Sequence, residues 1–288
     1  MTQRYTGIAA LAAAAALVLA GCTPAADEPI DETPAFPEGS TMAALAEAGT
    51  ITIGTKFDQP LFGLMNPTTQ MPEGFDVEIG TIIAGELGIS ADNIEWVESV
   101  SANRESFIEE GVVDLVVATY TINDARKERI SFAGPYYVAG QSILVLAGNP
   151  ENIQGPDDLT GKKVCTVTGS TPEQKLIELG ADVQATDIYS NCLEPLRNGT
   201  VVAVSTDNVI LAGLAAQNEG EFEVAGDPFT EEPYGIGVTH DDTDFRMWIN
   251  DVLEEIAADG RWEAAWMATA GTVLPPATAP GVDRYEAM

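Results

Sequence analysis

Positive charge is scarce in this chain. Its 288 residues include 13 Lys and Arg against 45 Asp and Glu, so the formal net charge is −32. Nucleic-acid binding needs clustered Lys and Arg facing the phosphates, so this balance excludes most nucleic-acid-binding proteins and predicts no nucleic-acid partner. An anionic membrane surface would also repel the chain.

Histidine and cysteine are nearly absent. The one His, His240, stands in a polar stretch that predicts a solvated loop rather than a metal site, and the three Cys form no CxxC or Cys/His spacing. We therefore expect no metal and no cofactor. The chain also lacks a nucleophile motif and a His for acid–base catalysis, which speaks against an enzyme.

Long apolar runs are absent except at the beginning. Ile8 to Ala20 is an unbroken apolar run that follows Arg4, and it is shorter than the roughly 20 residues that span a bilayer. This pattern predicts a signal peptide over residues 1–21. The run ends in Leu19-Ala20-Gly21-Cys22, which resembles a bacterial lipobox, so Cys22 is the expected attachment site of a lipid such as palmitate. The alternative is an ordinary signal peptide with an incidental Cys.

Two segments are rich in proline. Residues 22–41 combine prolines with acidic residues and contain no basic residue, which predicts a disordered tether. Residues 271–288 are expected to form an extended C-terminal tail. Lipid and tether together predict an extracytoplasmic protein that is anchored to the outer face of the cell membrane. In that compartment Cys165 and Cys192 are expected to form a disulfide, with two buried free thiols as the alternative.

The rest of the chain alternates strand and helix patterns. Such alternation predicts an α/β fold with mainly parallel sheets covered by helices, whose ligands bind beyond the C-terminal ends of the strands. The expected strands are Thr50–Gly54, Ile94–Val97, Asp114–Thr119, Ser142–Ala147, Lys163–Val167, Val201–Thr206 and Tyr234–Thr239. The expected helices are Phe75–Leu87, Arg104–Glu110, Pro172–Leu179, Asn191–Arg197, Asn208–Gln217, Asp244–Ala258 and Arg261–Met267.

Three of these strands end in polar segments that suit charged groups of a ligand. Thr119–Arg129 offers hydroxyls and an Arg to a carboxylate, or it is a capped surface helix. Val167–Gln174 predicts a capped helix whose N-terminus attracts anions, or a helix without a ligand. Asp207, just after a strand, suits a ligand ammonium, or it caps the next helix.

The combination of motifs resembles the family 3 solute-binding proteins of polar amino-acid ABC transporters. The resemblance rests on Gly74–Ile79, Asp114–Glu128 and Phe132–Tyr137, and it extends over nearly all of residues 42–270. It implies a periplasmic-binding-protein-like fold, with two α/β lobes joined by two hinge strands, that closes around one amino acid. The implied large lobe comprises residues 42–139 and 234–270, and the implied small lobe residues 140–233, with crossings near 136–139 and 230–233.

The resemblance also implies roles for individual residues. Arg126 and Thr121 would bind the ligand α-carboxylate, and Ser170 and Thr171 would close on it from the small lobe. The carbonyl of Thr119 would belong to the same site, and Asp207 would bind the α-ammonium.

The side chain of the ligand would meet a second group of residues. Lys56, Ser101 and Arg104 correspond to positions that meet a side-chain carboxylate in family members that bind acidic amino acids, and Tyr189 can reach the same end. The alternatives are a solvated lysine at Lys56 and a helix-surface charge at Arg104.

These residues imply a monomeric receptor that captures glutamate and delivers it to an ABC permease, with aspartate second and glutamine a further possible cargo. The first alternative is an enzyme on the same scaffold, such as a dehydratase or lyase. The second is an amino-acid sensor, which would need a following transmembrane helix that this sequence does not contain.

Overall fold

Residues 35–285 are described by the computed structural model, and they all belong to one unit, Thr33–Met288. The expected signal peptide over 1–21, Cys22 and the first part of the expected tether lie outside the described residues. So do residues 286–288.

The described residues form short helices and strands in alternation. The α-helices are α1 (Thr41–Ala48), α2 (Phe75–Glu86), α3 (Arg104–Glu109), α4 (Asp124–Lys127), α5 (Thr171–Glu178), α6 (Leu193–Arg197), α7 (Asn208–Gln217), α8 (Thr243–Asp259) and α9 (Arg261–Ala268). The strands are β1 (Ile51–Thr55), β2 (Asp58–Gln59), β3 (Gly63–Met65), β4 (Pro72–Glu73), β5 (Ile94–Glu98), β6 (Leu115–Val116), β7 (Ser131–Ala139), β8 (Gln141–Leu146), β9 (Lys163–Val167), β10 (Asp182–Thr186), β11 (Ala203–Asp207), β12 (Phe222–Ala225) and β13 (Glu232–Val238). Short 3-10 helices include η2 (Ser101–Asn103), η4 (Tyr189–Cys192) and η5 (Ala270–Thr272).

The large lobe is built on a five-stranded sheet of order β5-β1-β6-β13-β7. The first three strands are parallel, whereas β13 runs antiparallel to both β6 and β7. Strand β13 comes from the far end of the chain, so the sheet joins two distant segments. The segment between β1 and β5 contains β2, β3 and β4, which form a separate small sheet.

The small lobe is built on a second five-stranded sheet of order β10-β9-β11-β8-β12. Here β9, β10 and β11 are parallel, and β8 is antiparallel to β11 and β12. Both sheets are therefore mixed, while the sequence pattern predicted mainly parallel ones. The difference arises because β7 leads directly into β8, and β12 into β13, without a helical crossover between them.

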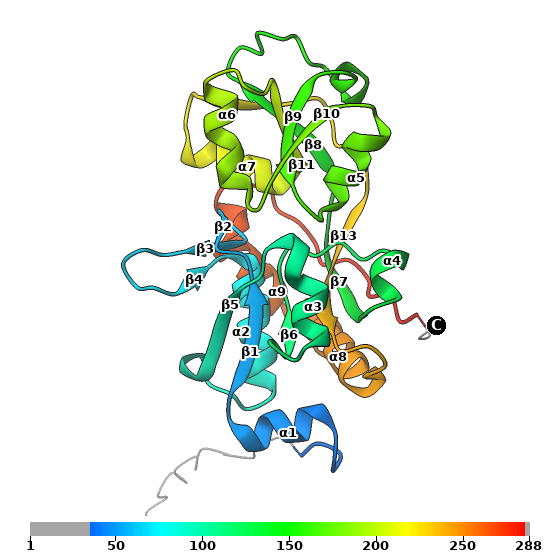
Figure 1. Ribbon diagram of the computed structural model, residues 1–288. Coiled ribbons are helices and arrows are strands. Elements are labelled where there is room, and N and C mark those ends of the chain that lie inside the picture. Colours follow the sequence, from blue (N-terminus) through cyan, green and yellow to red (C-terminus); the bar gives the residue numbers. More distant parts are fainter. Residues whose placement is uncertain (1–34, 286–288) are drawn as a thin grey trace, which may run out of the picture. The chain divides into compact units, whose positions relative to one another are not determined.

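Two strands connect the lobes. The end of β7 pairs antiparallel with the start of β13, with Ala139 opposite Glu232, and the chain turns from β7 into β8 at Gly140 (Figure 1). This is the expected architecture of two α/β lobes joined by two hinge strands.

The two lobes touch in this structure. A Cβ built on Gly213 of α7 would lie 2.6 Å from the carbonyl oxygen of Pro60, which follows β2. A Cβ built on Gly169 would lie 3.0 Å from the Cα of Ala102 in η2, and Gly169 also has a φ of +76°. Each glycine therefore permits a close approach of the lobes that a larger residue would obstruct.

Several elements lie at or near their predicted bounds. Helix α7 has the predicted bounds, α2 ends one residue earlier than predicted, and β1 is shifted by one residue at both ends. Strand β6 is shorter than the predicted Asp114–Thr119. Thr119, beyond its end, has a φ of +44°, a conformation that interrupts a strand.

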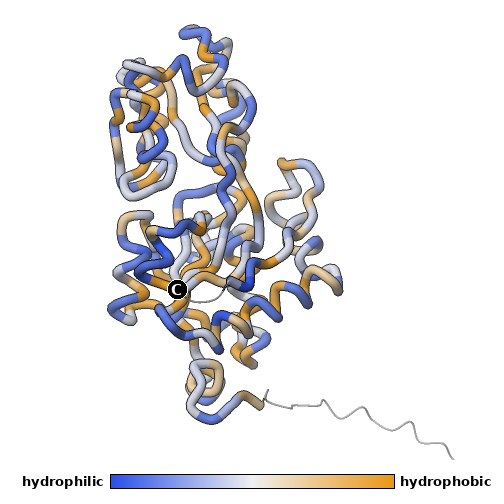
Figure 2. Tube along the Cα trace, turned by 90° about the vertical axis from the view of Figure 1, so that its right-hand side faces the viewer, coloured by the Kyte–Doolittle hydropathy of each residue, from blue (hydrophilic) through white to orange (hydrophobic). Residues whose placement is uncertain are grey.

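The segment that was expected to be an extended tail has no regular strand or helix after η5, yet it is packed. Its apolar residues Leu274, Ala277, Ala279 and Val282 pack against the main core. Tyr285 lies between the Lys127 ammonium and the Arg246 guanidinium, 4.2 and 4.4 Å from its ring centre. Figure 2, a view turned by 90°, shows hydrophilic and hydrophobic residues interspersed along the trace of the described chain.

The last part of the expected tether, residues 35–41, is described and is also partly packed. The Phe36 ring meets Trp248 of α8 edge-on at 5.7 Å. Helix α1 then begins at Thr41, where the Ser40 hydroxyl accepts a hydrogen bond from the Ala43 N–H.

Candidate functional site

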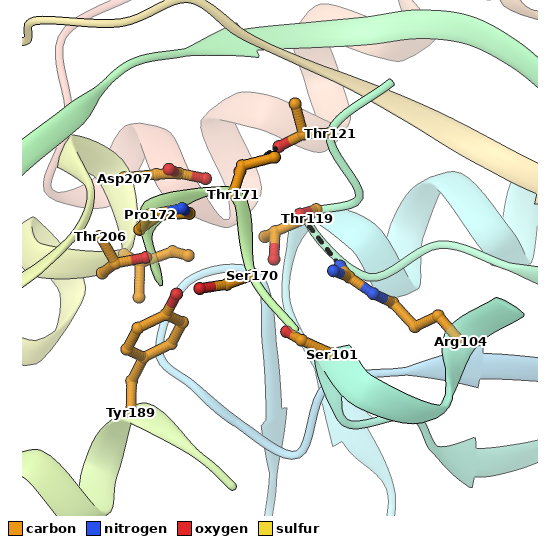
Figure 3. A pocket seen from close by; sticks show the side chains of 11 residues that line it. Ser101, Arg104, Thr119, Thr121, Ser170, Thr171, Pro172, Tyr189, Thr206 and Asp207 are labelled. Atoms are coloured by element: carbon orange, nitrogen blue, oxygen red, sulfur yellow. Dashed lines mark hydrogen bonds between the residues drawn. The ribbon is translucent and has the colours of Figure 1, made fainter. Parts of the chain in front are cut away.

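A small cavity of about 10 Å³ lies between the lobes (Figure 3). This volume corresponds to about one water molecule, so the lobes must part to admit a larger ligand. The residues that line it come from both lobes: Ser101, Arg104, Thr119, Thr121, Ser170, Thr171, Pro172, Tyr189, Thr206, Asp207 and Ile210. This set contains eight of the ten ligand-binding residues predicted from the sequence. The other two, Lys56 and Arg126, lie next to it.

Thr119 is held in place by a buried acid. The carboxylate of Asp76 in α2 accepts hydrogen bonds from the Thr119 N–H at 2.7 Å and from the Tyr136 hydroxyl. Burial raises the pKa of the Asp76 carboxyl to about 7. The Thr119 hydroxyl contacts Gln59 Oε1 at 2.9 Å. These contacts fix the turn that follows β6 at the floor of the cavity.

Arg104 is a buried cation rather than a helix-surface charge. Its Nη1 donates to the carbonyl oxygens of Ala118 and Thr119 at 3.0 and 3.4 Å, and its guanidinium lies 4.0 Å from the Tyr120 ring centre. Its Nε has no hydrogen-bond partner among the described residues. The side chain therefore retains capacity to bind an anion.

Lys56 is also buried, not solvated as the alternative interpretation would have it. Only 3% of its surface is exposed, and its Nζ donates to the Ser101 hydroxyl at 3.0 Å. Burial, together with the nearby Arg104 charge, lowers the pKa of the Lys56 ammonium well below its ordinary value. Lys56 therefore lies behind Ser101, one side chain away from the cavity.

Arg126 lies in an adjoining open cavity of about 340 Å³ that also includes Glu105 and Gly169. Its Nε lies 3.2 Å from Glu105 Oε1, and its Nη atoms donate to the carbonyl oxygens of Thr121 at 2.6 Å and Gly169 at 3.2 Å. Burial and the Arg104 charge lower the pKa of Arg126 to about 10. Gly169 belongs to the small lobe, so parting the lobes releases one of these donors.

The start of α5 contributes hydroxyls from the small lobe. The Ser170 hydroxyl caps the helix by accepting from the Glu173 N–H and donates to the Val167 carbonyl. The Thr171 hydroxyl donates to Glu232 Oε2 at 2.7 Å. Both predicted side-chain donors are thus engaged within the protein in this closed arrangement.

Asp207 does not cap α7, which was its alternative interpretation. Its side chain makes no capping hydrogen bond and instead accepts from the Tyr234 hydroxyl, while Oδ1 has no partner among the described residues. Burial, and next the Glu232 charge, raise the pKa of Asp207 to about 7. Burial, followed by the Asp207 charge, raises the pKa of Tyr189 to about 12. An unpaired buried carboxylate oxygen beside a cavity suits a cation.

Several supporting residues were not predicted. Asp76, Glu105 and Tyr120 orient the predicted ones, and Glu232 holds Thr171. Asp76 and Tyr120 belong to motifs that were recognised without a role being assigned to them. Glu105 and Glu232 give no signal in sequence spacing, because each acts through a residue that is distant in the sequence.

Cys165 and Cys192 form a disulfide, as expected, that links β9 to η4 beside Tyr189. His240 pairs with Asp241 at 3.0 Å. Within residues 35–285 no group of three or more His, Cys, Asp or Glu side chains is placed to hold a metal ion. In the same residues no helix is both long and apolar enough to cross a membrane.

A two-lobed α/β body whose lobes meet at a closed cavity, with Arg104 on one side and Asp207 on the other, is an architecture suited to binding a small solute. The family model of bacterial extracellular solute-binding proteins, family 3, matches residues 51–267. The chain belongs to this family, so it is a solute-binding protein that works outside the cytoplasm.

Named relatives are consistent with this assignment. The glutamate-binding protein GluB of Corynebacterium efficiens is 44% identical over 237 residues, which are 78% of this chain and 80% of the relative. The glutamine-binding protein GlnH of an ABC transporter in Bacillus subtilis is 35% identical over 77% of this chain and 82% of its own.

Solved structures agree. An ancestral arginine-binding protein bound to glutamine matches with a TM-score of 0.72 and 33% identity, over 77% of this chain and 97% of its own. The ancestral amino-acid-binding protein AncCDT-1, a precursor of cyclohexadienyl dehydratase, matches with a TM-score of 0.73 and 27% identity, over 80% of this chain and 99% of its own.

Proposed function

We propose that this protein captures L-glutamate by closing its lobes and delivers it to an ABC importer. The observation that supports this most is the convergence of three buried cations, Lys56, Arg104 and Arg126, at one cleft. Burying three cations costs free energy unless anions accompany them. Glutamate brings two carboxylates, and among the standard amino acids only glutamate and aspartate combine one ammonium with two carboxylates.

In this proposal the two carboxylates occupy different ends of the cleft. Arg126 and Thr121 bind the α-carboxylate, with Ser170 and Thr171 closing from the small lobe. Asp207 binds the α-ammonium because its carboxylate retains an unpaired oxygen.

The side-chain carboxylate lies near Ser101 and Arg104, with Lys56 supporting them. Tyr189 borders the same cavity from the small lobe. Since the cavity is formed by both lobes, cargo that touches both stabilises the closed state.

Thermal shift and calorimetry with glutamate, aspartate and glutamine test the cargo. Glutamate should bind about 10- to 100-fold more tightly than glutamine, because an amide in place of the carboxylate leaves a buried cation without its partner. Equal or tighter glutamine binding would remove glutamate as the cargo. Glutamine is the competing candidate because a named relative is a glutamine-binding protein.

An enzyme is the other class to test. Mass spectrometry of glutamate incubated with the protein should recover it unchanged, since the polar residues of the cavity are used for binding. Conversion of glutamate would instead assign catalysis to this scaffold.

The lipid anchor on Cys22 is proposed from the lipobox-like sequence alone. Mass spectrometry of the N-terminal peptide should show a lipidated Cys22, and Cys22→Ser should release the protein from the membrane fraction. A monomer is expected by size measurement in detergent. Co-purification with a permease would identify the importer.

A further inference from the structure

Glu232 is a buried carboxylate that none of the proposed binding roles uses. It opens β13 at the second crossing between the lobes and is 4% exposed. Its Oε2 accepts from the Thr171 hydroxyl at 2.7 Å, and its Oε1 accepts from the Thr230 hydroxyl, also at 2.7 Å. Both oxygens of this acid are thus hydrogen-bonded within the protein.

The partners of Glu232 connect it to both crossings. The Thr230 hydroxyl accepts from the N–H of Gln141, the residue that opens β8 just after the first crossing. Thr171 begins α5 at the edge of the cleft, and its hydroxyl oxygen lies 3.5 Å from that of Thr121 in the large lobe. One carboxylate therefore links the two hinge segments to the contact between the lobes.

The shorter of the two Thr171 contacts decides where its hydrogen points. A hydroxyl has one hydrogen, and a carboxylate oxygen at 2.7 Å is a stronger acceptor than a hydroxyl at 3.5 Å. The Thr171 hydrogen thus points to Glu232. Its lone pairs remain free to accept a hydrogen bond from Thr121.

The backbone and the side chain of Glu232 are bonded to different parts of the molecule. Its backbone pairs with Ala139 in the ladder of β7 and β13, while its carboxylate is bonded to Thr171 and Thr230. A rotation of the small lobe against this ladder would therefore change the Glu232–Thr171 distance. Glu232 does not line the interlobe cavity.

We infer that Glu232 is a positioning residue that stabilises the closed arrangement of the lobes without contacting the cargo. This inference rests on the proposed capture by lobe closure. It adds that Glu232 helps to set the equilibrium between the open and closed states. The affinity of a binding protein for any cargo scales with the population of its competent state. Loss of the Glu232 contacts therefore weakens all cargoes by the same factor.

The central test compares Glu232→Gln with Glu231→Gln. Glu231 is the exposed neighbour of Glu232, so its substitution makes the same change of charge without touching the buried contacts. Glu232→Gln should weaken glutamate, aspartate and glutamine alike, by about 5- to 10-fold, the scale of replacing a charged by a neutral hydrogen-bond partner. Glu231→Gln should leave all dissociation constants near those of the wild type.

A distance measurement without ligand tests closure directly. Val112 in the large lobe and Ile177 in the small lobe are exposed and can each be replaced by a labelled Cys. Double electron–electron resonance or Förster resonance energy transfer between the two labels then reports the interlobe distance. Glu232→Gln should shift the distribution to longer distances. Gly213→Ala places a methyl group against Pro60 and should hold the lobes apart, so it serves as the reference for the open state.

Thr171→Val removes the donor of the Thr171–Glu232 hydrogen bond, so it tests the same bond if Glu232→Gln does not fold. Its effect on the ligand-free distance should match that of Glu232→Gln, and the double variant should add little to either. An unchanged distance distribution in both variants would overturn the inference. A loss confined to one amino acid would also overturn it, because Glu232 would then contact the cargo. The distance measurement needs no cargo, so its outcome stands apart from the identity of the solute.

Discussion

The two faces of the cleft differ in chemistry. The large lobe presents Arg104 at the cavity with Lys56 and Arg126 beside it, and the Tyr120 ring lies within 5.0 Å of both guanidiniums. In the described chain, the small-lobe residues that line the cavity include hydroxyls and Asp207 but no Lys or Arg. The cationic side chains thus belong to the large-lobe face, while the acid that lines the cavity, Asp207, belongs to the small-lobe face.

The two lobes also differ in how they are stabilised. The small-lobe face is braced by the disulfide between Cys165 and Cys192 beside Tyr189, whereas the large-lobe face is braced by buried hydrogen bonds such as those of Asp76. A cross-link acts through the unfolded chain, and a hydrogen bond acts through the native geometry. The binding function and the stability of the lobes should therefore respond to different substitutions.

The largest expected effect tests the cationic face. Arg126→Ala should weaken glutamate binding by about 2 to 5 kcal/mol, the scale for truncating one partner of a buried charge pair. Isothermal titration calorimetry measures it. Arg129→Ala is the matched control, because Arg129 pairs with Glu109 at the surface and should change affinity little. Near-native binding by Arg126→Ala would remove this residue from the site.

The next effect tests the small-lobe brace. The bridged residues are 27 apart in sequence, so replacing both Cys by Ala should lower the free energy of unfolding by about 3 to 4 kcal/mol in the chain-entropy model. Urea unfolding followed by circular dichroism measures the change. We expect the small lobe to unfold at lower urea than the large lobe in this variant. Coincident loss of both lobes would show that their stabilities are coupled.

A smaller effect separates the cations from one another. Lys56→Gln should weaken glutamate by about 1 to 3 kcal/mol more than it weakens glutamine, since only glutamate has a second carboxylate to lose its cation. Calorimetry with both ligands measures the difference. The exposed Lys163 of the small lobe provides the control, as Lys163→Gln. Equal losses for the two ligands would mean that Lys56 does not distinguish the side chain.

The smallest effect concerns pH and the small-lobe acid. The pKa of Asp207 is raised to about 7, so the carboxylate gains a proton as the pH falls below that value. An ammonium binds the ionised form, so glutamate affinity should fall by up to about tenfold per pH unit below 7. Calorimetry from pH 8 to pH 6 measures this slope, which over that range amounts to at most about tenfold. Asp207→Asn should bind weakly and lose that part of the slope, and an unaltered slope would assign it to another group such as Asp76.

Parts of the fold were predictable because local signals agreed there. Asn208–Gln217 is an unbroken apolar run between a polar start and a polar end, long enough for a helix, and α7 has those bounds. Strands β2, β3 and β4 were not predicted, because strands of two or three residues show too little alternation. Strand β10 was missed since most of its residues are exposed or half-buried, without a clear apolar face.

Site residues that belong to sequence motifs could be predicted. Residues that act through a partner far away in the sequence could not. Thr121 and Asp207 follow strands in recognisable motifs, and both line the cavity. Glu105 and Glu232 act through Arg126 and Thr171, which lie far away in sequence. Such pairs become visible only when the lobes are placed together.

The order of strands in the large-lobe sheet constrains how the chain folds. Strand β13 lies between β6 and β7, although it follows the whole small lobe in sequence. Pairing β6 with β13 therefore closes a loop that contains the small lobe, and an unfolded loop of that length carries an entropic cost. All five strands of the small-lobe sheet lie between Gln141 and Ala225, in one continuous stretch. The small lobe can thus fold first and shorten that loop. In that order of folding, the pairing of β6 with β13 completes the large lobe after the small lobe has folded.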